Sequence, residues 1–398
     1  MTTPTTVALG EVLRQRDDSV GVIRDETYPI AGIYGFGRGL FAREPILGSQ
    51  TSYTALNRLH AGTFVISRVK AWEGAVGVVP PELEGYFVSK EFPSFVANAE
   101  RLDLRWLKYF FDSEHGRRAL AGCTKGIGAR RERVKEAVFL DIALSLPPLS
   151  EQQAVVARLD ALTAKTEQLN AHLDAAERDA EHLLALRFRD AIANAPLLPM
   201  AKVAPLVRRE VSIAPETSYT ELGVRSFFKG TFRRRTVIGA EFSWQDLYWI
   251  KKDDLVFSNI MAWEQAIAVA KSEDDGCVGN HRMLTCKAKA DCAVPGFLWY
   301  HFTTPDGFDK VYAASPGTAA RNRTITASAL MAIRVPTPPL ATQQSFERLQ
   351  AEVEALMAEH AAIRAANAAL LPATLERIFG SRSGVGLRPR SPRATSCG

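Results

Sequence analysis

The most constraining feature of this sequence is an internal repeat at an offset of 191 residues. Under this offset the octapeptide AWEGAVGV at 71–78 falls on AWEQAIAV at 262–269, with five of eight positions identical. Aromatic and glycine residues that coincide include Tyr28 with Tyr219, Gly32 with Gly223, Phe36 with Phe227, Gly39 with Gly230 and Gly48 with Gly239. The register needs no gap and ends with Pro147-Pro148-Leu149 on Pro338-Pro339-Leu340. Chance does not readily hold one register for so long, so the chain is a tandem duplication.

The composition is close to the average for soluble globular proteins, with 23% charged and 46% hydrophobic residues in a chain of 398. Wholesale disorder is thereby excluded. No apolar run reaches the roughly 18 residues of a membrane span, and no signal peptide is recognisable. The five cysteines are scattered rather than paired as C-x-x-C, so neither a disulfide framework nor a structural zinc site is expected. We therefore expect a cytoplasmic protein without a membrane segment.

Each copy ends in a segment with the pattern of a long helix. Ser150 and Gln153 fit the S-x-x-Q form of the capping box. Apolar or small residues then recur at alternating spacings of three and four, which is a heptad seam. The polar His360 and Asn367 interrupt the second seam and are expected to fix its register, and Pro372 is expected to kink or stop the helix near 371. The seam residues are Leu159, Leu162, Thr166, Leu169, Leu173, Ala176, Ala180 and Leu183 in the first copy, and Phe346, Leu349, Val353, Leu356, His360, Ile363, Asn367 and Leu370 in the second.

The two helices are expected to pack on each other. At 1.5 Å per residue, the first helix would be roughly 60 Å long and could not bury itself against a small domain. A lone amphipathic helix is more often ordinary core packing, but two at equivalent places in a duplicated chain favour a coiled coil, antiparallel or nearly so. The chain is then divided into a first domain at 1–149, a spacer helix at 150–194, a second domain at 195–340, a second spacer helix at 341–380 and an arginine-rich tail at 381–398, which we expect to be disordered.

Positive charge is concentrated in the two globular halves. Residues 101–135 carry a net charge of +6 and residues 225–252 carry +5, whereas both helical segments contain more acidic than basic residues. Clustered positive charge supplies the salt-dependent attraction of nucleic-acid binders to phosphate. A single run of charge is usually a solvated face, but its occurrence in both copies favours a polyanionic partner.

The candidate DNA-contacting residues lie in two regions of each copy. Glycine-led loops, GIGARRER at 126–133 and GTAARNRT at 317–324, suit close approach to a phosphate backbone. Arginine favours guanine and asparagine favours adenine, so the coincidence of Arg68 with Asn259 suggests that the copies read different bases. The candidates in and beside the glycine-led loops are Lys125, Arg130, Arg131, Arg133, Arg321, Asn322 and Arg323. The others are Arg38, Arg43, Arg68, Lys70, Arg225, Lys229, Arg233, Arg234, Arg235 and Asn259.

Signatures of catalysis are not recognisable in the sequence. It has no P-loop, no G-x-G-x-x-G fingerprint, no Asn- or Asp-Pro-Pro-aromatic tetrapeptide, and its histidines are scattered. Glu73 and Glu264 recur and could be taken as catalytic. We prefer Trp72 and Trp263 as packing anchors, with each glutamate ordering its neighbourhood. The chain is thus expected to be a binder with no catalytic residue and no metal site.

Two segments resemble a known family. GARRERVK at 128–135 and LPPLSEQQAVVARLD at 146–160 resemble the end of a target-recognition domain and the start of a conserved helix in the DNA specificity (S) subunits of type I restriction-modification systems. A degenerate second copy, TPPLATQQSF, stands at 337–346, and the resemblance spans 7–380.

The resemblance implies an α/β fold, with two tandem target-recognition domains in pseudo-twofold arrangement separated by an antiparallel pair of helices. Each domain would read one half of a bipartite, asymmetric target in double-stranded DNA. The helices would hold two methyltransferase (modification) subunits, to which restriction subunits with motor and nuclease activity attach. S-adenosylmethionine, ATP and magnesium would belong to those partners, with no cofactor in this chain. The residues assigned to the coiled coil and to partner docking are Gln152, Gln153, Leu159, Leu162, Leu169, Leu173, Leu183, Gln343, Gln344, Leu349, Val353, Leu356, Ile363 and Leu370.

Two alternatives stay open at the level of sequence. One is a nuclease or methyltransferase whose motif has diverged, which would be active without partners. The other is a coiled-coil scaffold without nucleic acid, against which a steep salt dependence of DNA association would argue. The target bases, the spacer length and the modified base are not encoded in any pattern that we recognise.

Overall fold

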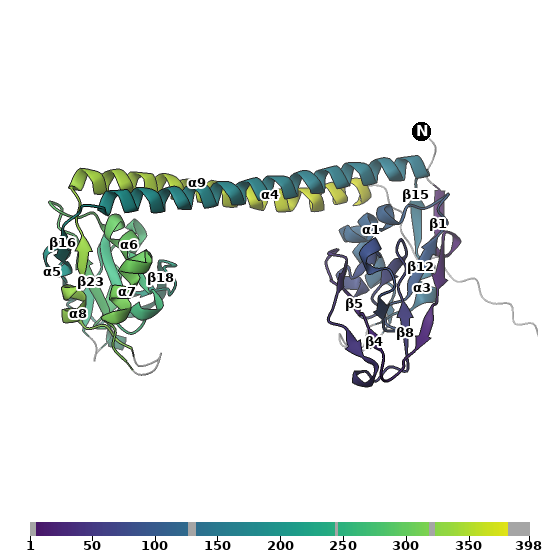
Figure 1. Cartoon of the computed structure of the whole chain (residues 1–398), viewed down its shortest axis with the longest axis horizontal. Coiled ribbons are helices and arrows are strands. Elements are labelled where there is room, and N and C mark those ends of the chain that lie inside the picture. The colour runs from purple at the N-terminus through teal and green to yellow at the C-terminus, as the bar shows by residue number, and fades with distance from the viewer. Residues whose placement is uncertain (1–4, 126–132, 243–245, 318–322, 381–398) are drawn as a thin grey trace, which may run out of the picture. The chain divides into compact units, whose positions relative to one another are not determined.

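The computed structural model describes residues 5–125, 133–242, 246–317 and 323–380. The chain divides into two compact units, of which unit 1 comprises residues 1–172 and 361–398 and unit 2 comprises residues 173–360. Each unit contains one globular copy of the repeat together with one part of each long helix (Figure 1). The units are described separately below.

The globular part of unit 1 is built on a four-stranded antiparallel sheet of order β10-β9-β12-β2, beside a three-stranded sheet of order β11-β8-β3. The strand pairs are β1-β15, β4-β7, β5-β6 and β13-β14. The strands are β1 (Thr5–Ala8), β2 (Leu13–Arg16), β3 (Ser19–Gly21), β4 (Thr27–Tyr28), β5 (Ala31–Ile33), β6 (Leu40–Ala42), β7 (Ile46–Leu47), β8 (Ala55–Arg58), β9 (Phe64–Ile66), β10 (Val76–Val78), β11 (Phe87–Val88), β12 (Ser94–Ala97), β13 (Thr124–Lys125), β14 (Arg133–Val134) and β15 (Ala143–Leu146). The helices are α1 (Leu104–Asp112), α2 (Glu114–Ala121) and α3 (Glu136–Leu140), with short 3₁₀ turns η1 (Leu9–Glu11), η2 (Gly48–Gln50), η3 (Ala71–Glu73) and η4 (Pro81–Leu83).

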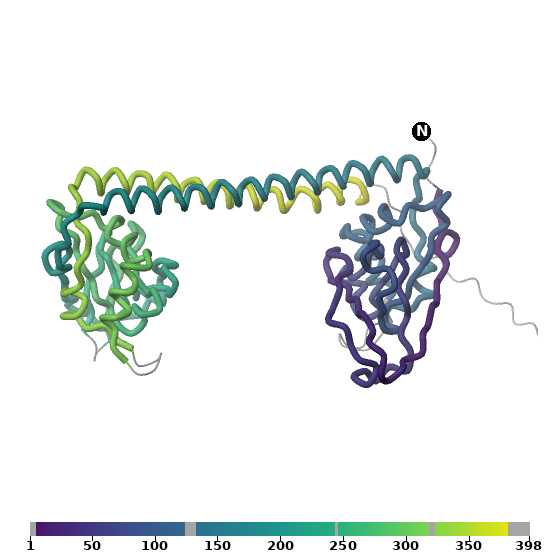
Figure 2. Tube along the Cα trace, in the orientation of Figure 1, coloured from purple at the N-terminus to yellow at the C-terminus, as the bar shows by residue number. Residues whose placement is uncertain are grey.

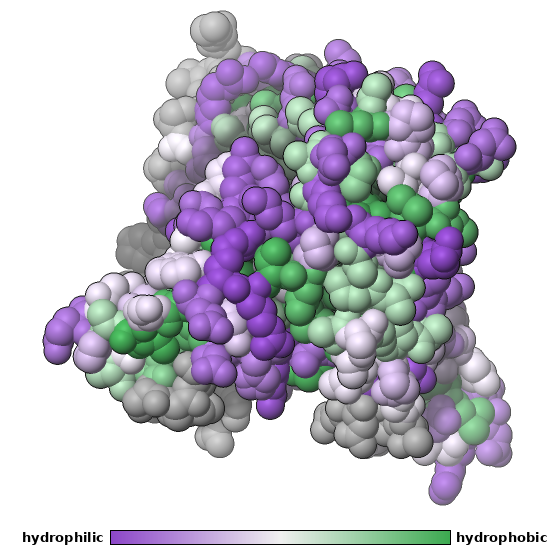
Figure 3. All heavy atoms as spheres, turned by 90° about the vertical axis from the view of Figure 1, so that its left-hand side faces the viewer, coloured by the Kyte–Doolittle hydropathy of each residue, from purple (hydrophilic) through white to green (hydrophobic). Residues whose placement is uncertain are grey.

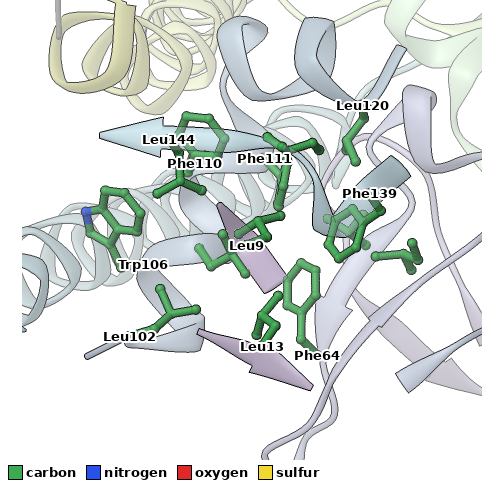
Figure 4. Packing of buried hydrophobic residues seen from close by; sticks show 14 of the residues in the cluster. Leu9, Leu13, Phe64, Leu102, Trp106, Phe110, Phe111, Leu120, Phe139 and Leu144 are labelled. Atoms are coloured by element: carbon green, nitrogen blue, oxygen red, sulfur yellow. The ribbon is translucent and has the colours of Figure 1, made fainter. Parts of the chain in front are cut away.

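Aromatic rings join the four-stranded sheet to its helices in the core of unit 1 (Figure 4). The ring of Phe139 in α3 lies 5.0 Å from that of Phe95 in β12 and 5.8 Å from that of Phe111 in α1. Trp106 of α1 extends this core to Phe379, near the end of the second long helix, at 5.5 Å. The globular domain and the helix end are therefore packed as one body within unit 1.

The globular part of unit 2 repeats this plan. Its sheets have the orders β21-β20-β23 and β18-β17-β22-β19, with the pair β16-β24. Phe257 in β20 packs edge to face against Phe302 in α6 at 5.4 Å. The expected mixture of helices and sheets is confirmed, and the pairing is almost entirely antiparallel. The strands are β16 (Leu197–Pro199), β17 (Ser218–Val224), β18 (Thr231–Ile238), β19 (Leu247–Trp249), β20 (Asp254–Ser258), β21 (Ile267–Val269), β22 (Val278–Asn280), β23 (Met283–Lys287) and β24 (Arg334–Pro336). The helices are α5 (Met200–Val203), α6 (Pro295–Thr303), α7 (Pro305–Ala313) and α8 (Ala327–Ala332), with 3₁₀ turns η5 (Gly239–Phe242), η6 (Ala262–Glu264) and η7 (Ser272–Asp274).

The corner between α1 and α2 recurs between α6 and α7. Ser113 and Thr304 cap the second helix of each corner by accepting a hydrogen bond from the amides of Gly116 and Gly307. A Cβ atom on either glycine would lie about 2 Å from a carbonyl oxygen at the end of the preceding helix. The repeat in sequence is therefore a repeat in backbone geometry.

The two long helices are α4 (Leu149–Ile192) and α9 (Leu340–Leu375), the latter continuing as a π-helical turn, η9 (Glu376–Gly380). In unit 2, Phe188 lies 5.4 Å from Phe346, whereas His360 bonds Glu177 at 3.0 Å. Later residues of α4 thus meet earlier residues of α9, so the pairing is antiparallel, as Figure 2 shows. In unit 1, the Asn367 amide donates to the side chain of Asn170 at 3.5 Å.

The polar seam residues are confirmed, because His360 and Asn367 are both buried against α4. The apolar seam of α4 departs from the expected heptad beyond Ala180. Leu184 and Phe188 are buried, whereas Leu183 is 40% exposed. A straight helix drifts against a 3.5-residue repeat, and here α4 also contacts α6 of the globular domain. Among the other assigned residues, Leu159, Leu173 and Val353 are buried, Leu162, Leu349, Leu356 and Ile363 are half-buried, and Leu169, Leu370, Gln153 and Gln344 are exposed.

The helix ends also differ from the sequence-based expectations. Ser150 lies inside the first turn of α4, and the carbonyl of Pro148 accepts from the amides of Glu151 and Gln152, so Ser150 does not cap this helix. Pro372 does not stop α9 near Leu371. A proline removes one backbone donor and crowds the carbonyl four residues before it, but beyond it Leu375 and Phe379 are buried in the core of unit 1, and this packing holds the end of the helix in place.

Figure 3 shows hydrophilic residues interspersed with smaller hydrophobic groups over the face that it presents. No helix in the described parts of the chain is long and apolar enough to span a membrane.

Candidate nucleic-acid interface

A β-hairpin in each unit presents a phenylalanine at its tip. Residues 34–39 join β5 to β6, and residues 225–230 join β17 to β18. Phe36 and Phe227, which coincide under the repeat, have φ angles of 59° and 61° and are 74% and 59% exposed. Residues that have a side chain rarely adopt this left-handed backbone conformation. The same unusual tip is therefore built twice.

The Ala-Trp-Glu turns η3 and η6 hold these tips in place. The amide of Phe36 donates to the carbonyl of Glu73 at 2.7 Å, and that of Phe227 donates to the carbonyl of Glu264 at 3.0 Å. The Glu264 carboxylate also accepts from the hydroxyl of Ser226 at 2.6 Å. Both tryptophans are half-buried, and each indole donates to a backbone carbonyl three residues before it. Both glutamates therefore order their neighbourhood as expected, through their carbonyls and, for Glu264, through the carboxylate as well. The role of the two tryptophans as packing anchors stays a prediction.

The support beneath each tip differs between the units. In unit 1, Lys108 Nζ donates to the carbonyl of Gly37 at 3.0 Å and to the Asp112 carboxylate at 2.5 Å. Burial raises the pKa of Asp112, and the neighbouring Lys108 opposes this shift. In unit 2 the equivalent contact is apolar, because Phe228 packs edge to face against Trp299 at 6.3 Å. One backbone arrangement is thus supported by an ion pair in one unit and by aromatic packing in the other.

The residue three positions before each Ala-Trp-Glu turn holds the segment that follows the glycine-led loop. The amide of Val134 donates to the carbonyl of Arg68 at 2.9 Å, and the amide of Ile325 donates to that of Asn259 at 2.9 Å. These two bonds are equivalent under the repeat. Arg68 and Asn259 therefore stand at one structural position, three residues before the turn that holds the phenylalanine hairpin.

Arg43 and Arg234 are matched cations on the two hairpins. Both are exposed, and the aliphatic stem of each lies across the glycine of the facing strand, Gly32 or Gly223. A Cβ on Gly32 would lie 3.3 Å from Arg43, and one on Gly223 would lie 3.1 Å from Arg234. The glycines therefore let the arginine stems lie flat on the hairpin, with their guanidinium groups at the surface.

The other loop cations are braced by their own hairpins. The Arg38 guanidinium lies 4.6 Å from the ring centroid of Tyr34, and that of Arg225 lies 4.9 Å from Phe232. Lys229 Nζ lies 5.8 Å from the ring of Phe227. Cation–π contacts of this kind hold a charge in position while leaving its outer side accessible.

Several candidates are occupied by internal contacts. Arg68 pairs with Glu136 at 3.4 Å, Lys70 with Glu73 at 3.8 Å, Arg133 with Glu91 at 3.2 Å and Arg235 with Glu221 at 2.8 Å. Arg233 donates to the backbone carbonyl of Glu273, and Arg323 donates to that of Ser315 at 3.1 Å. These residues are less available to DNA than the sequence suggested, because a bidentate contact would have to replace the existing one. Arg130, Arg131, Arg321 and Asn322 lie outside the described residues, as does the side chain of Lys125.

Gln152 and Gln343 were assigned to partner docking, but the structure places both in the interior. Gln152 Oε1 accepts from the amide of Asp103 at 2.9 Å, and its Nε2 donates to the carbonyls of Arg101 and Pro147, both at 2.9 Å. Gln343 makes the same three contacts 191 residues later, with Val294, Cys292 and Pro338. Both glutamines are fully buried. They fasten each long helix to its own globular domain and are removed from the docking set.

Unit 2 has a groove beside Asn259 that the sequence did not indicate. A cavity of about 710 Å³ is lined by Asn259, Trp263, Glu264, His281 and Arg282 among others. The carbonyl of Arg282 accepts from the amide of Asn259 at 2.8 Å, which fixes the two residues together. Pairing across the sheet brings Arg282 to this place, so linear sequence alone did not single it out.

The equivalent position in unit 1 is Glu91, whose carbonyl accepts from the amide of Arg68 at 2.8 Å. The copies therefore share a backbone and carry opposite charges, glutamate in one and arginine in the other. A carboxylate accepts from cytosine, whereas arginine donates to guanine. In unit 1 the Glu91 carboxylate is paired with Arg133, whereas in unit 2 Arg282 lines the groove, so the matched positions differ in charge and in availability. No cluster of three or more His, Cys, Asp or Glu side chains is placed to hold a metal ion within the described ranges.

No protein-family model matches this chain, and no curated protein matches it with statistical significance. Solved structures, in contrast, do match this chain in fold. The HsdS subunit from Thermoanaerobacter tengcongensis is 19% identical, with a TM-score of 0.61 over 95% of this chain and 97% of that one. A chain from a structural study of complex assembly and conformational transition of the type I R-M system is also 19% identical, with a TM-score of 0.66 over 95% and 97%. With its duplicated globular domains and its antiparallel helix pair, the chain has the fold of the HsdS specificity subunits of type I restriction-modification systems.

Proposed function

We propose that this protein is the DNA specificity subunit of a type I restriction-modification complex. The observation that carries the proposal is the repeated loop arrangement. In each unit the Ala-Trp-Glu turn bonds a cationic hairpin, and the residue three positions before that turn bonds the segment beside a glycine-led loop. In unit 2, Asn259 and Arg282 line an open groove, whereas the matched Arg68 and Glu91 of unit 1 are held in ion pairs. This difference at matched positions supports different base preferences in the two units. Each unit then reads one half of a bipartite, asymmetric target in double-stranded DNA.

The long helices supply the second part of the proposed function. Their exposed residues include Gln153 and Gln344 near the two N-termini, and both helical segments are acidic overall. This surface differs in charge from the hairpins, which suits a protein partner better than DNA. We assign it to two methyltransferase subunits, through which the motor and nuclease subunits join the complex. Methyl transfer and cleavage, with S-adenosylmethionine, ATP and magnesium, belong to those partners and not to this chain.

The proposal is tested by reconstitution with methyltransferase subunits encoded beside this gene. The purified complex is incubated with S-adenosylmethionine and genomic DNA, and methylated bases are mapped. We expect methylation at one split sequence, and none when this chain is omitted. Methylation that does not depend on this chain, or methyl transfer or cleavage by this chain alone, would overturn the proposal.

A further inference from the structure

We propose that Phe36 and Phe227 are wedge residues, which press their rings against the stacked bases of the two half-sites. The inference rests on the proposed function and adds an apolar contact to the expected charged ones. The first observation is how exposed these two side chains are. These two residues are the most exposed large hydrophobic side chains in the described parts of the chain, at 74% and 59%. Other phenylalanines of the same hairpins, such as Phe41 and Phe232, are packed against a facing glycine.

The backbone conformation of these tips is unfavourable without a compensating use. A φ near +60° is disfavoured for a residue with a side chain, and glycine would adopt it without penalty. Positions of this kind cluster where a strained backbone serves binding. Glycine does occupy a left-handed position three residues later in both loops, at Gly39 and Gly230. Both copies thus carry a phenylalanine whose apolar ring is exposed to water and whose backbone conformation would suit glycine better.

The tips are held rigidly rather than left to move. The amides of Phe36 and Phe227 bond the turns η3 and η6, and the next amide in each loop does the same, from Gly37 to Gly74 at 3.2 Å and from Phe228 at 3.0 Å. A loop backbone fixed in this way loses little conformational entropy on binding, so only the rotation of the ring remains to be restricted. The tip is therefore prepared for contact before a partner arrives.

Charge identifies the partner as DNA. Arg38 and Lys229 flank the tips within the loops, and the exposed Arg43 and Arg234 follow on the next strands. An isolated apolar tip would suit a protein surface equally well, but a tip ringed by cations fits the phosphates on either side of a base step.

The chemistry of the phenyl ring limits which properties of DNA it can recognise. Phenylalanine has no donor or acceptor and cannot distinguish base edges by hydrogen bonding. It can insert beside a base step and partly unstack it, which is easiest at flexible pyrimidine–purine steps. Phe36 and Phe227 would therefore select for deformability, one in each half-site, while neighbouring polar side chains select for base edges.

The test uses the full chain and duplexes that the wild-type chain selects from a randomised pool. 2-Aminopurine is placed at each step in turn, because its fluorescence rises when a base is unstacked. The variants are Phe36→Gly and Phe227→Gly, since glycine fits the positive φ and keeps the loop conformation. Phe36→Leu retains apolar bulk, and Tyr53→Ala removes an exposed aromatic residue outside the hairpins as a matched control.

We expect each glycine variant to lose affinity roughly 5- to 100-fold, as for removal of a base-stacking ring, and to lose the fluorescence rise in one half-site only. Phe36→Leu should retain part of both signals, and Tyr53→Ala should bind like wild type. The melting temperature should not fall in the glycine variants; a fall together with lost binding in both half-sites would assign these residues to structure and overturn the inference. Unchanged affinity and fluorescence would overturn it too, with the proposed function left standing. If the wild-type chain selected no sequence at all, that result would instead contradict the proposed function.

Discussion

Several residues that coincide in the two copies are ones whose replacement would disturb the backbone. The hydroxyl of Tyr28 accepts from the amide of Ile23 at 2.9 Å, and that of Tyr219 accepts from the amide of Ala214 at 2.9 Å. A Cβ on Gly48 would lie 2.0 Å from a carbonyl oxygen, as would one on its counterpart 191 residues later. At the candidate base-reading positions Arg68 and Asn259 the copies carry different side chains on the same backbone instead.

Arg43 and Arg234 offer the simplest test of single residues at this interface. If each guanidinium contacts a phosphate, replacement by alanine should weaken binding uniformly across DNA sequences and reduce the salt slope by about one. If it contacts a guanine edge, the loss should be about 1–3 kcal/mol and confined to one base position. Fluorescence anisotropy at several salt concentrations, on selected and unrelated duplexes, separates these outcomes. Equal binding by wild type and both variants on all DNA would remove Arg43 and Arg234 from the interface.

His301 provides a residue-scale prediction about pH. It is buried among aromatic rings, and neither ring nitrogen has a hydrogen-bond partner within the described residues. Burial lowers the pKa of His301 to about 4. Between that value and an unfolded pKa near 6.5, the unfolded state binds the proton more readily, so unit 2 should lose stability as pH falls through this window, by up to about 3 kcal/mol.

Phe110 occupies the position of His301 in the first copy, so His301→Phe is a natural replacement. The variant should be more stable than wild type, and its advantage should grow as the pH is lowered from 7 to about 4.5. Urea midpoints for unit 2 at several pH values measure this, with His182→Gln, at an exposed histidine of the same unit, as the control. An advantage that does not change with pH would mean that His301 titrates normally in the folded state.

At the scale of elements, the decisive contact is the glutamine that joins each long helix to its domain. Replacing Gln343 by leucine leaves a buried amide and two buried carbonyls without their partner. We expect unit 2 to lose about 2–3 kcal/mol. Gln344→Leu, at the exposed neighbouring position, should change stability little. Urea unfolding of both variants compares them, and similar losses would show that the buried contacts of Gln343 are not responsible.

The corrected helix seam makes a second prediction at this scale. Phe188 contacts Phe297, Tyr300 and Phe346 with ring centroids 4.9–5.4 Å apart, whereas Leu183 is 40% exposed. Phe188→Ala should cost about 3–5 kcal/mol, as for other large-to-small core replacements. Leu183→Ala should cost well under 1 kcal/mol. Thermal unfolding distinguishes the observed seam, which contains Phe188, from the seam expected from the heptad pattern, which contains Leu183. If the expected seam were correct, Leu183→Ala would have the larger effect.

The sequence predicted those elements that depend on local periodicity and failed where distant partners decide. Heptad spacing was sufficient for the two helices and for the burial of His360 and Asn367. It could not anticipate the shift to Leu184, because that depends on contact between α4 and the globular domain. The buried role of Gln152 was missed since its partners are backbone atoms about 50 residues away. Phe36 was missed because a side chain's exposure cannot be read along a chain, although the surrounding glycines of GFGRG hinted at an unusual turn.

At the scale of the whole molecule, unit 2 is a continuous segment with its own helix pair and core. Residues 173–360 contain both sides of the seam around Phe188, and the Gln343 contacts lie entirely within them. We therefore expect this fragment to fold alone, with a single cooperative urea transition that matches one of two transitions in the full chain.

The isolated fragment should also retain the DNA preference of its own half-site. Because linkage of two binding modules raises the effective concentration of the second, the full chain should bind the complete target about 10²- to 10⁴-fold more tightly than the fragment does. Selection from randomised duplexes, run in parallel on the fragment and the full chain, tests both statements. If the fragment folds but selects no sequence, recognition does not divide between the units and the bipartite target must be abandoned. If it selects one half of the full-length target, base reading within that half belongs to residues 173–360 alone.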